Sequence, residues 1–170
     1  MDGIRLELLS DAHLAGLAAL VADEEVLRFT RVPTPVPPDF AQTWIGRYEE
    51  ARRDGTREAF AVVDGDGAFL GLAMAPVIDR EGRTAELGYI VAPEARGRGV
   101  ATQALRLLTG WGFGTLGALR LELHIGVDNE ASRRVAANCG YVREGVLRSV
   151  HVKQDVRADT EIWSRLPTDP

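Results

Sequence analysis

The stretch from residue 89 to residue 108 holds the residues whose types and spacing are best suited to chemistry. It reads YIVAPEARGRGVATQALRLL: an apolar segment, a proline, a loop of alternating arginine and glycine, and a run of helical periodicity. Glycines without a Cβ let a bulky group approach the backbone, and Arg96 and Arg98 supply positive charge. The first turn of a helix presents unpaired backbone N–H groups and a partial positive charge. The stretch therefore predicts an anion site around Gly97 and Gly99, and we interpret it as a pyrophosphate cradle.

Two other phosphate-binding loops fit this stretch poorly. A Walker loop requires a glycine followed by lysine and then serine or threonine, and the segment contains no lysine. A dinucleotide fingerprint requires a third glycine at the position where Thr102 stands. The remaining alternative is a tight strand-to-helix turn whose arginines are only solvated.

The run from Arg96 to Ala101, RGRGVA, resembles the Arg/Gln-x-x-Gly-x-Gly/Ala signature of the GCN5-related N-acetyltransferases (GNAT). Farther along, DNEAS at 128–132 followed by NCGYVREG at 138–145 is similar to the RimJ/RimL-like branch, which acetylates the N-termini of ribosomal proteins. The resemblance covers nearly the whole chain. It leaves the acceptor open, because this branch also holds antibiotic, polyamine and unassigned amine acetyltransferases.

The resemblance implies acetyl-coenzyme A (acetyl-CoA) as the cosubstrate and gives the loop residues to its pyrophosphate. These cofactor-binding candidates are Arg96, Gly97, Arg98, Gly99, Val100 and Ala101. In the family, the preceding strand splays from its neighbour and its backbone receives the pantetheine and the thioester carbonyl. The equivalent residues here are Tyr89, Ile90 and Val91.

Asn129 and Ser132 are the expected contacts for the pantetheine arm and the sulfur. They are three residues apart at a predicted helix start, so they lie on one face. The resemblance gives Ser132 a catalytic role, in which its hydroxyl stabilises the departing thiolate by a hydrogen bond. The alternative is that both residues only satisfy unpaired N–H groups of the first helical turn.

Acetyl transfer from a thioester to an amine needs a neutral amine, a donor for the carbonyl oxygen as it becomes negative, and stabilisation of the thiolate. Glu86 is the catalytic candidate for the base. It shares a strand face with Ile90 and could take the amine proton through water or attract a cationic substrate. The alternative is a cross-strand ion pair with an arginine. An α-amine has a pKa of about 7.7–8.0 and a lysine amine about 10.4, so the absence of an evident tuned base favours an α-amine acceptor.

The histidines and the cysteine add no metal or nucleophile site. His13, His124 and His151 have no partner at metal-ligand spacing, so we expect no metal. His124 is the histidine most worth testing, because it stands near the end of a strand that should border the cofactor. Cys139 ends an apolar helix face and is expected to be a buried structural thiol.

Composition limits the remaining function classes. A chain of 170 residues with 45% hydrophobic content suits one domain over residues 1–170. A net charge of −5 with interspersed signs argues against a nucleic-acid partner bound through phosphates. One cysteine excludes an intramolecular disulfide, and the sequence shows no signal pattern and no bilayer-spanning run. We therefore expect a cytoplasmic protein without a membrane partner.

The candidate residues must be positioned by a mixed set of elements. Periodicity and turn signals predict strands at 4–8, 60–63, 69–77, 84–92, 119–125, 141–152 and 159–166, and helices at 14–21, 40–55, 100–111 and 131–139. Four prolines make 31–38 an ordered loop or lid. The fold class is α+β, and the resemblance implies a GNAT-type mixed, mostly antiparallel sheet of about six to seven strands flanked by helices.

Residues and resemblance together predict an acetyl-CoA-dependent N-acetyltransferase that acts by direct transfer to a primary amine. The favoured acceptor is a protein or peptide N-terminal α-amine. The alternatives are a small-molecule amine acetyltransferase, acting on an antibiotic or a polyamine, and a coenzyme-A-binding module without turnover. A homodimer is compatible with the resemblance.

Overall fold

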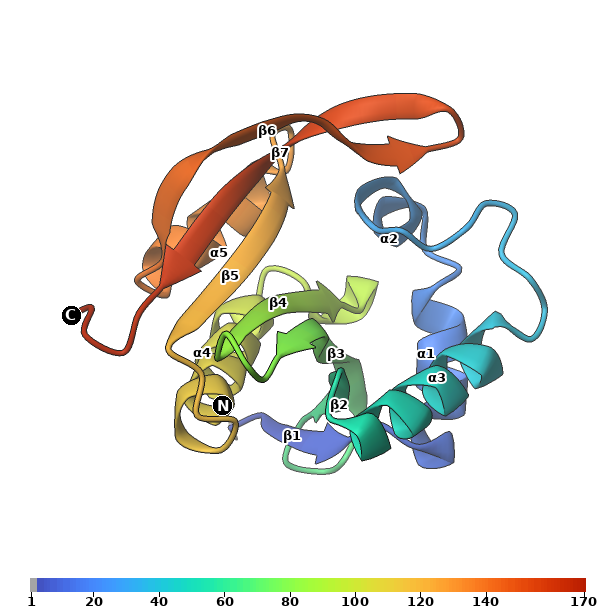
Figure 1. Cartoon of the computed structure of the whole chain (residues 1–170). Coiled ribbons are helices and arrows are strands. Elements are labelled where there is room, and N and C mark those ends of the chain that lie inside the picture. Colours follow the sequence, from blue (N-terminus) through green and yellow to red (C-terminus); the bar gives the residue numbers. More distant parts are fainter. Residues whose placement is uncertain (1–2) are drawn as a thin grey trace.

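The computed structural model describes residues 3–170 and has a seven-stranded sheet at its centre, in the order β1-β2-β3-β4-β5-β7-β6 (Figure 1). Neighbouring strands are antiparallel except for β4 and β5, which run parallel. The strands are β1 (Arg5–Leu8), β2 (Glu58–Val63), β3 (Phe69–Asp79), β4 (Thr84–Val91), β5 (Arg120–Gly126), β6 (Val142–Lys153) and β7 (Val156–Arg165). The expected α+β fold with a mostly antiparallel sheet is confirmed.

Helices cover both faces of the sheet. They are α1 (Leu14–Leu20), α2 (Glu24–Phe29), α3 (Phe40–Asp54), α4 (Val100–Gly114) and α5 (Glu130–Asn138), with short 3-10 helices η1 (Asp11–His13) and η2 (Pro93–Ala95). Helices α1 and α3 contact β3 and β2, whereas α4 and α5 lie on the opposite face against β4 and β5 (Figure 1). No helix within residues 3–170 is both long and apolar enough to cross a membrane.

The alternation along β5 decides which of its side chains reach each face. Leu121 and Leu123 are buried in the core, whereas Glu122 and His124 point to the other face. Leu121 packs closely on α4, because a Cβ built on Gly112 would lie 2.8 Å from its Cδ2 atom. The glycine therefore brings α4 close to the sheet and fixes the helix that follows the predicted phosphate loop.

Two elements differ from the sequence expectation. Helix α2 was not predicted, because six residues are too few to show a helical period. Its start is marked by Asp23, whose side chain accepts a hydrogen bond from Val26 N at 3.0 Å. Strand β7 begins three residues earlier than expected, because Gln154 and Asp155, with φ of 48° and 62°, form a two-residue hairpin turn.

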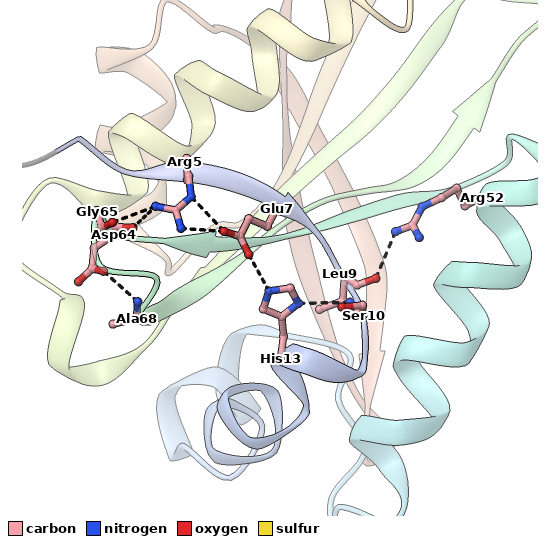
Figure 2. A network of polar contacts seen from close by, with 9 residues as sticks. All are labelled: Arg5, Glu7, Leu9, Ser10, His13, Arg52, Asp64, Gly65 and Ala68. Atoms are coloured by element: carbon pink, nitrogen blue, oxygen red, sulfur yellow. Dashed lines mark hydrogen bonds and ion pairs between the residues drawn. The ribbon is translucent and has the colours of Figure 1, made fainter.

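Polar contacts fix the edge strand β1 (Figure 2). Arg5 Nη1 donates to the carbonyl oxygen of Asp64 at 2.6 Å, and Arg5 Nε donates to Glu7 at 3.0 Å. His13 Nδ1 accepts from Ser10 N at 3.3 Å, so its Nε2 donates to Glu7, also at 3.3 Å. The bonds from His13 and then Arg5 lower the pKa of Glu7. His13 therefore has a structural role at this edge.

Candidate functional site

Strands β4 and β5 separate in the middle of the sheet. Their parallel pairing ends at Leu87 and Leu123, although β4 continues to Val91 and β5 to Gly126. Beyond that point, within the described chain, β4 pairs only with β3 and β5 only with β7. Backbone N–H and C=O groups on the facing edges are thus left without a strand partner. The strand residues expected to receive an acyl donor, Tyr89, Ile90 and Val91, lie at this opening.

The glycine-arginine loop leads from this opening into α4. Gly97 and Gly99 have φ of 71° and 77°, the left-handed region that favours glycine. A Cβ on Gly97 would meet no heavy atom within 4 Å, and one on Gly99 would meet only Gln103 Nε2, at 3.9 Å. No side chain caps the first turn of α4. The loop therefore presents backbone N–H groups beside open space, which fits a diphosphate. Because the Val100 side chain is buried, only its backbone can contact such a ligand.

Arg96 is committed to protein partners. Its Nη2 pairs with Asp23 Oδ1 at 2.5 Å, its Nη1 with Glu25 Oε2 at 2.9 Å, and its Nε donates to Val91 O at 3.3 Å. The hydrogen bond from Arg96 is the main cause of the lowered pKa of Asp23. The structure thus places Arg96 as a brace between α2, the end of β4 and the loop, with its charge already matched by carboxylates. Sequence reasoning missed this brace because α2 was not predicted.

Arg98 is the loop arginine with an uncommitted charge. It is exposed and has no ion pair among residues 3–170. Its side chain lines a small cavity of about 170 Å³ together with Asp64, Asp66 and Gln103. Of the two predicted loop cations, Arg98 is therefore the one free to contact an anion.

The start of α5 brings three candidate residues together. Asn129 Oδ1 accepts from Ser132 N at 3.1 Å, so Asn129 is a helix cap, as the alternative interpretation predicted, and only its amide nitrogen remains for a ligand. The Tyr89 hydroxyl lies 3.5 Å from the Ser132 carbonyl oxygen. Burial raises the pKa of Tyr89 to about 12, so its phenol stays protonated at neutral pH. Sequence reasoning gave Tyr89 only a backbone role. Tyr89 lies two residues after Leu87, however, so its side chain lies on the same face of the sheet, the face covered by α4 and α5.

On the opposite face, Glu86 lies where the two strands begin to separate. Its Cα pairs with that of Glu122, and its Oε2 is 3.7 Å from His124 Nδ1. Among residues 3–170, Glu86 has no ion pair with an arginine, which the alternative required; its neighbour is His124, which would be charged only if protonated. His124 Nε2 is 3.3 Å from Glu122 Oε2. Burial acts to raise the pKa of Glu122, but hydrogen bonds from Arg120 and His124 outweigh it and lower this pKa.

Other features of the described residues lie outside this arrangement. A larger cavity, about 510 Å³, lies between α5 and the β6–β7 hairpin and is lined by Arg133, Arg143 and Glu161 among others. It uses a different face of α5 from Asn129 and Ser132, so it is not the opening between β4 and β5. No three histidine, cysteine, aspartate or glutamate side chains within residues 3–170 are grouped to hold a metal ion. Burial raises the pKa of the Cys139 thiol, which disfavours the reactive thiolate.

Known proteins resemble this chain in sequence and in fold. YoaA, an uncharacterized N-acetyltransferase of Bacillus subtilis, is 28% identical over 174 residues, which is 96% of this chain and 93% of that protein. The spermidine N(1)-acetyltransferase of Vibrio cholerae is 30% identical over 100 residues, or 59% of this chain and 58% of that enzyme. The solved structure of RimL, a ribosomal alpha-N-protein acetyltransferase in complex with coenzyme A, has the same fold, with a TM-score of 0.89 at 18% identity over 96% of this chain and 94% of that one.

Residues 4–142, which are most of the chain, match the family model of the acetyltransferase (GNAT) domain. This match agrees with the separated strands and with the open glycine loop. The chain therefore belongs to the GNAT family of N-acetyltransferases, enzymes that use acetyl-CoA as the acyl donor.

Proposed function

We propose that this protein transfers the acetyl group of acetyl-CoA directly to a primary amine within a ternary complex, and that its acceptor is the α-amine of a protein or peptide N-terminus. The observation that carries the proposal is the separation of β4 from β5 after Leu87 and Leu123, directly beside the open loop at the start of α4. One molecule of acetyl-CoA can then place its diphosphate at the loop and its thioester between the strands.

The residues around the opening can divide the work as follows. Backbone N–H groups from Gly97 to Ala101 hold the diphosphate, with Arg98 adding charge. Backbone groups of Tyr89, Ile90 and Val91 hold the pantetheine and donate to the carbonyl oxygen as it becomes negative. The amide of Asn129 contacts the pantetheine arm. Ser132 donates a hydrogen bond to the departing thiolate, and Glu86 takes the amine proton through water.

The acid–base groups favour an acceptor of modest basicity. Deprotonating a lysine amine instead of an α-amine costs about 3.5 kcal/mol more at neutral pH, from a pKa difference of about 2.5. The Glu86 side chain is 21% exposed and lies beside His124, and among residues 3–170 it has no ion pair with lysine or arginine. Such a set suits an α-amine better than a lysine side chain.

A polyamine or other small cationic amine is the second candidate. Glu86 and Glu122 lie on one face beside the opening and would attract a cation. The relationship to spermidine N(1)-acetyltransferases supports this alternative. A coenzyme-A-binding module without turnover is the third.

Thiol release separates the three candidates. Purified protein is mixed with acetyl-CoA and either a hexapeptide with a free α-amine, the same peptide blocked at its N-terminus, or spermidine. We expect release of free coenzyme A with the free peptide and not with the blocked one. Turnover of spermidine alone would support the polyamine reading. Saturable binding of acetyl-CoA by calorimetry without turnover of any of a panel of amines would support the binding module.

We also propose the domain organisation, the compartment and the oligomeric state of this enzyme. Residues 1–170 form a single acetyltransferase domain, the protein acts in the cytoplasm, and two copies form a homodimer. Light scattering after gel filtration tests the dimer, and a mass of one chain at working concentration would reject it.

A further inference from the structure

Three side chains, Glu86, His124 and Glu122, lie in a row on the sheet face beside the opening between β4 and β5. Glu86 Oε2 lies 3.7 Å from His124 Nδ1, and His124 Nε2 lies 3.3 Å from Glu122 Oε2. We propose that His124 is the proton relay of the acetyl transfer, receiving the proton that Glu86 collects from the amine and releasing one toward Glu122. This inference rests on the proposed role of Glu86 as the first acceptor of that proton.

The partners of Glu122 decide which ring nitrogen of His124 carries hydrogen. Arg120 Nε donates to Glu122 Oε1 at 2.6 Å, and the lowered pKa keeps Glu122 an anion. A carboxylate can only accept hydrogen bonds, so His124 Nε2 must donate to it. In the neutral ring the lone pair is then on Nδ1, the nitrogen that faces Glu86. The ring is therefore oriented to accept a proton from that side.

The proton moves in balanced steps. The ammonium group loses one proton to the Glu86 carboxylate through water and becomes the neutral amine, which attacks the thioester carbon. As the C–N bond forms and the C–S bond breaks, the amine gives up a second proton, which the departing thiolate takes to leave as free coenzyme A. The carboxylic acid of Glu86 passes the proton to Nδ1 of His124, while the proton on Nε2 leaves to water beside Glu122. A separation of 3.7 Å is slightly too long for a hydrogen bond, so in the middle step a small side-chain movement brings Glu86 Oε2 and His124 Nδ1 together before the proton passes. A second exchange with water returns the ring to its starting tautomer.

An imidazole is a better final acceptor than a carboxylate. An ordinary glutamate has a pKa of about 4.3 and an ordinary histidine about 6.5, against about 7.7–8.0 for an α-amine. Passing the proton from a carboxylate to an imidazole therefore lowers the pKa difference from the amine by about two units. A carboxylate alone would return the proton to the amine.

The surroundings of His124 allow this role. The side chains of Glu86, His124 and Glu122 are 21%, 26% and 30% exposed, so water reaches each of them. Across β7 the facing residue is the apolar Ile162, and Arg120 is held by Glu122 and by Glu144. From α3, the buried Tyr48 lies close enough that the charge of Glu86 helps to raise its pKa, although burial is the main cause.

Kinetics of His124→Gln test the relay. Glutamine keeps the size and the donor for Glu122 but cannot carry a proton. With the free hexapeptide and with spermidine as acceptors, we expect kcat to fall about 100-fold at neutral pH, the low end of a general acid–base contribution. KM for acetyl-CoA should not change. With the peptide, the loss should shrink as pH rises above the α-amine pKa, because the amine then needs no base. His151→Gln is the matched control and should keep the wild-type rate.

A pH-independent loss would assign His124 a structural role and overturn the relay, as would a rate equal to that of the wild type. The variant Glu86→Gln distinguishes the role of Glu86 as base from the role of His124 as relay. If the rate falls in Glu86→Gln but not in His124→Gln, the base is supported and the relay is overturned. If acetyl-CoA binds but neither acceptor reacts with the wild-type protein, the proposed acceptors fail, and the relay is judged by its tautomer.

The tautomer can be measured without turnover. Long-range proton–nitrogen NMR spectra of the folded protein report which ring nitrogen carries hydrogen, and the His124→Gln variant identifies the His124 signals. We expect the Nε2–H form, and a shift away from it in Glu122→Gln, whose amide can donate to the ring. An Nδ1–H form in the wild-type protein would overturn the relay whatever the kinetics show.

Discussion

At the scale of single residues, two glycines decide whether the loop before α4 can hold a diphosphate. Gly97 and Gly99 both have positive φ, a backbone conformation that costs a residue with a Cβ about 1–2 kcal/mol of conformational energy. The space in front of them is open to the diphosphate that we propose binds there. Arg96, which the sequence also placed on the anion, is instead held by two carboxylates. We therefore propose that anion binding here depends on backbone shape more than on the number of arginines.

Replacing Gly99 by valine should abolish binding of acetyl-CoA. A β-branched residue resists a φ of 77° and would place its side chain over the first turn of α4. We expect calorimetric affinity to fall by at least about 100-fold, or about 2.7 kcal/mol. Gly110→Ala, within the same helix and facing open space, is the control and should bind normally. Unchanged affinity in Gly99→Val would show that the loop is only a turn.

Removing the Tyr89 hydroxyl should slow the reaction without weakening the binding of acetyl-CoA. This phenol lies beside Ser132 and, with a pKa of about 12, stays a hydrogen-bond donor across the working pH range. We propose that in the reaction this hydroxyl, like that of Ser132, turns to donate to the developing thiolate. A hydrogen bond to a charged group is worth about 1.5–3 kcal/mol, so Tyr89→Phe should lower kcat by about 10-fold or more. Tyr141→Phe is the control, because its hydroxyl bonds to the buried Thr109 at 2.8 Å. It should lower thermal stability and leave kcat unchanged. A wild-type kcat in Tyr89→Phe would exclude the contact with the thiolate.

At the scale of elements, α2 connects the loop before α4 with the β6–β7 hairpin, two segments that are distant in sequence. Its start is tied to the phosphate loop by Asp23 and Arg96. Its other end is tied to the β6–β7 hairpin, because Lys153 Nζ donates to the carbonyl oxygens of Leu27 and Thr30. In Figure 1 the tip of this hairpin extends toward α2. The position of α2 should therefore depend on its contacts with both the loop and the hairpin.

Breaking the Asp23–Arg96 pair should weaken acetyl-CoA binding through the loop. We expect Asp23→Asn and Arg96→Ala each to lower affinity about 5- to 10-fold, or about 1–1.4 kcal/mol. Because the two groups act on one contact, the double variant should lose little more than either single one, with a coupling energy of about 1 kcal/mol. Calorimetry of the four proteins measures this cycle. Additive losses would show that the pair does not position the loop.

The link between β5, β6 and β7 should weaken in acid. Hydrogen bonds from Arg120 and then Ser164 lower the pKa of Glu144 from 4.5 to about 2. A folded-state pKa below the unfolded one stabilises the fold above about pH 4.5, and this contribution is lost as pH falls toward about 2. Because the side chain is 43% exposed, screening limits it to about 1 kcal/mol or less. Glu144→Gln should therefore be less stable than wild type at pH 7 and equal to it near pH 2, in urea titrations. A pH-independent difference would contradict this assignment.

At the scale of the whole molecule, the ligand should stabilise the fold, since the unfolded chain has no opening between β4 and β5. At 100 times its dissociation constant a ligand adds about 2.7 kcal/mol. For a chain of this size that raises Tm by about 5–10 °C. Differential scanning calorimetry with and without acetyl-CoA measures the shift, and Gly99→Val should show none. A shift of equal size in that variant would place the binding site elsewhere.

Much of the architecture was readable in the sequence. The hairpin around residues 64–67 and the helix after Gly99 came from turn residues and periodicity, which are local properties. The α2 helix could not be found this way, because its six residues show no period and its position depends on contacts with Arg96 and Lys153. For the site, residue type and family resemblance led to the predictions for Glu86 and the loop. The ion-pair partners of Arg96 and the contact of the Tyr89 hydroxyl with Ser132 could not be predicted from the sequence.

The sequence by itself determined the loop, the alternation of the strands and the family, because these depend on residue type and on spacing along the chain. Tertiary structure alone decided where the pairing of β4 and β5 stops, which carboxylates take the charge of Arg96, and that His124 lies between Glu86 and Glu122. Apart from the contact of His124 with Glu122, two positions away on the same strand, these contacts join residues about 40 to 70 positions apart in the chain, and no local propensity encodes them. They follow from how seven strands and five helices pack around one core.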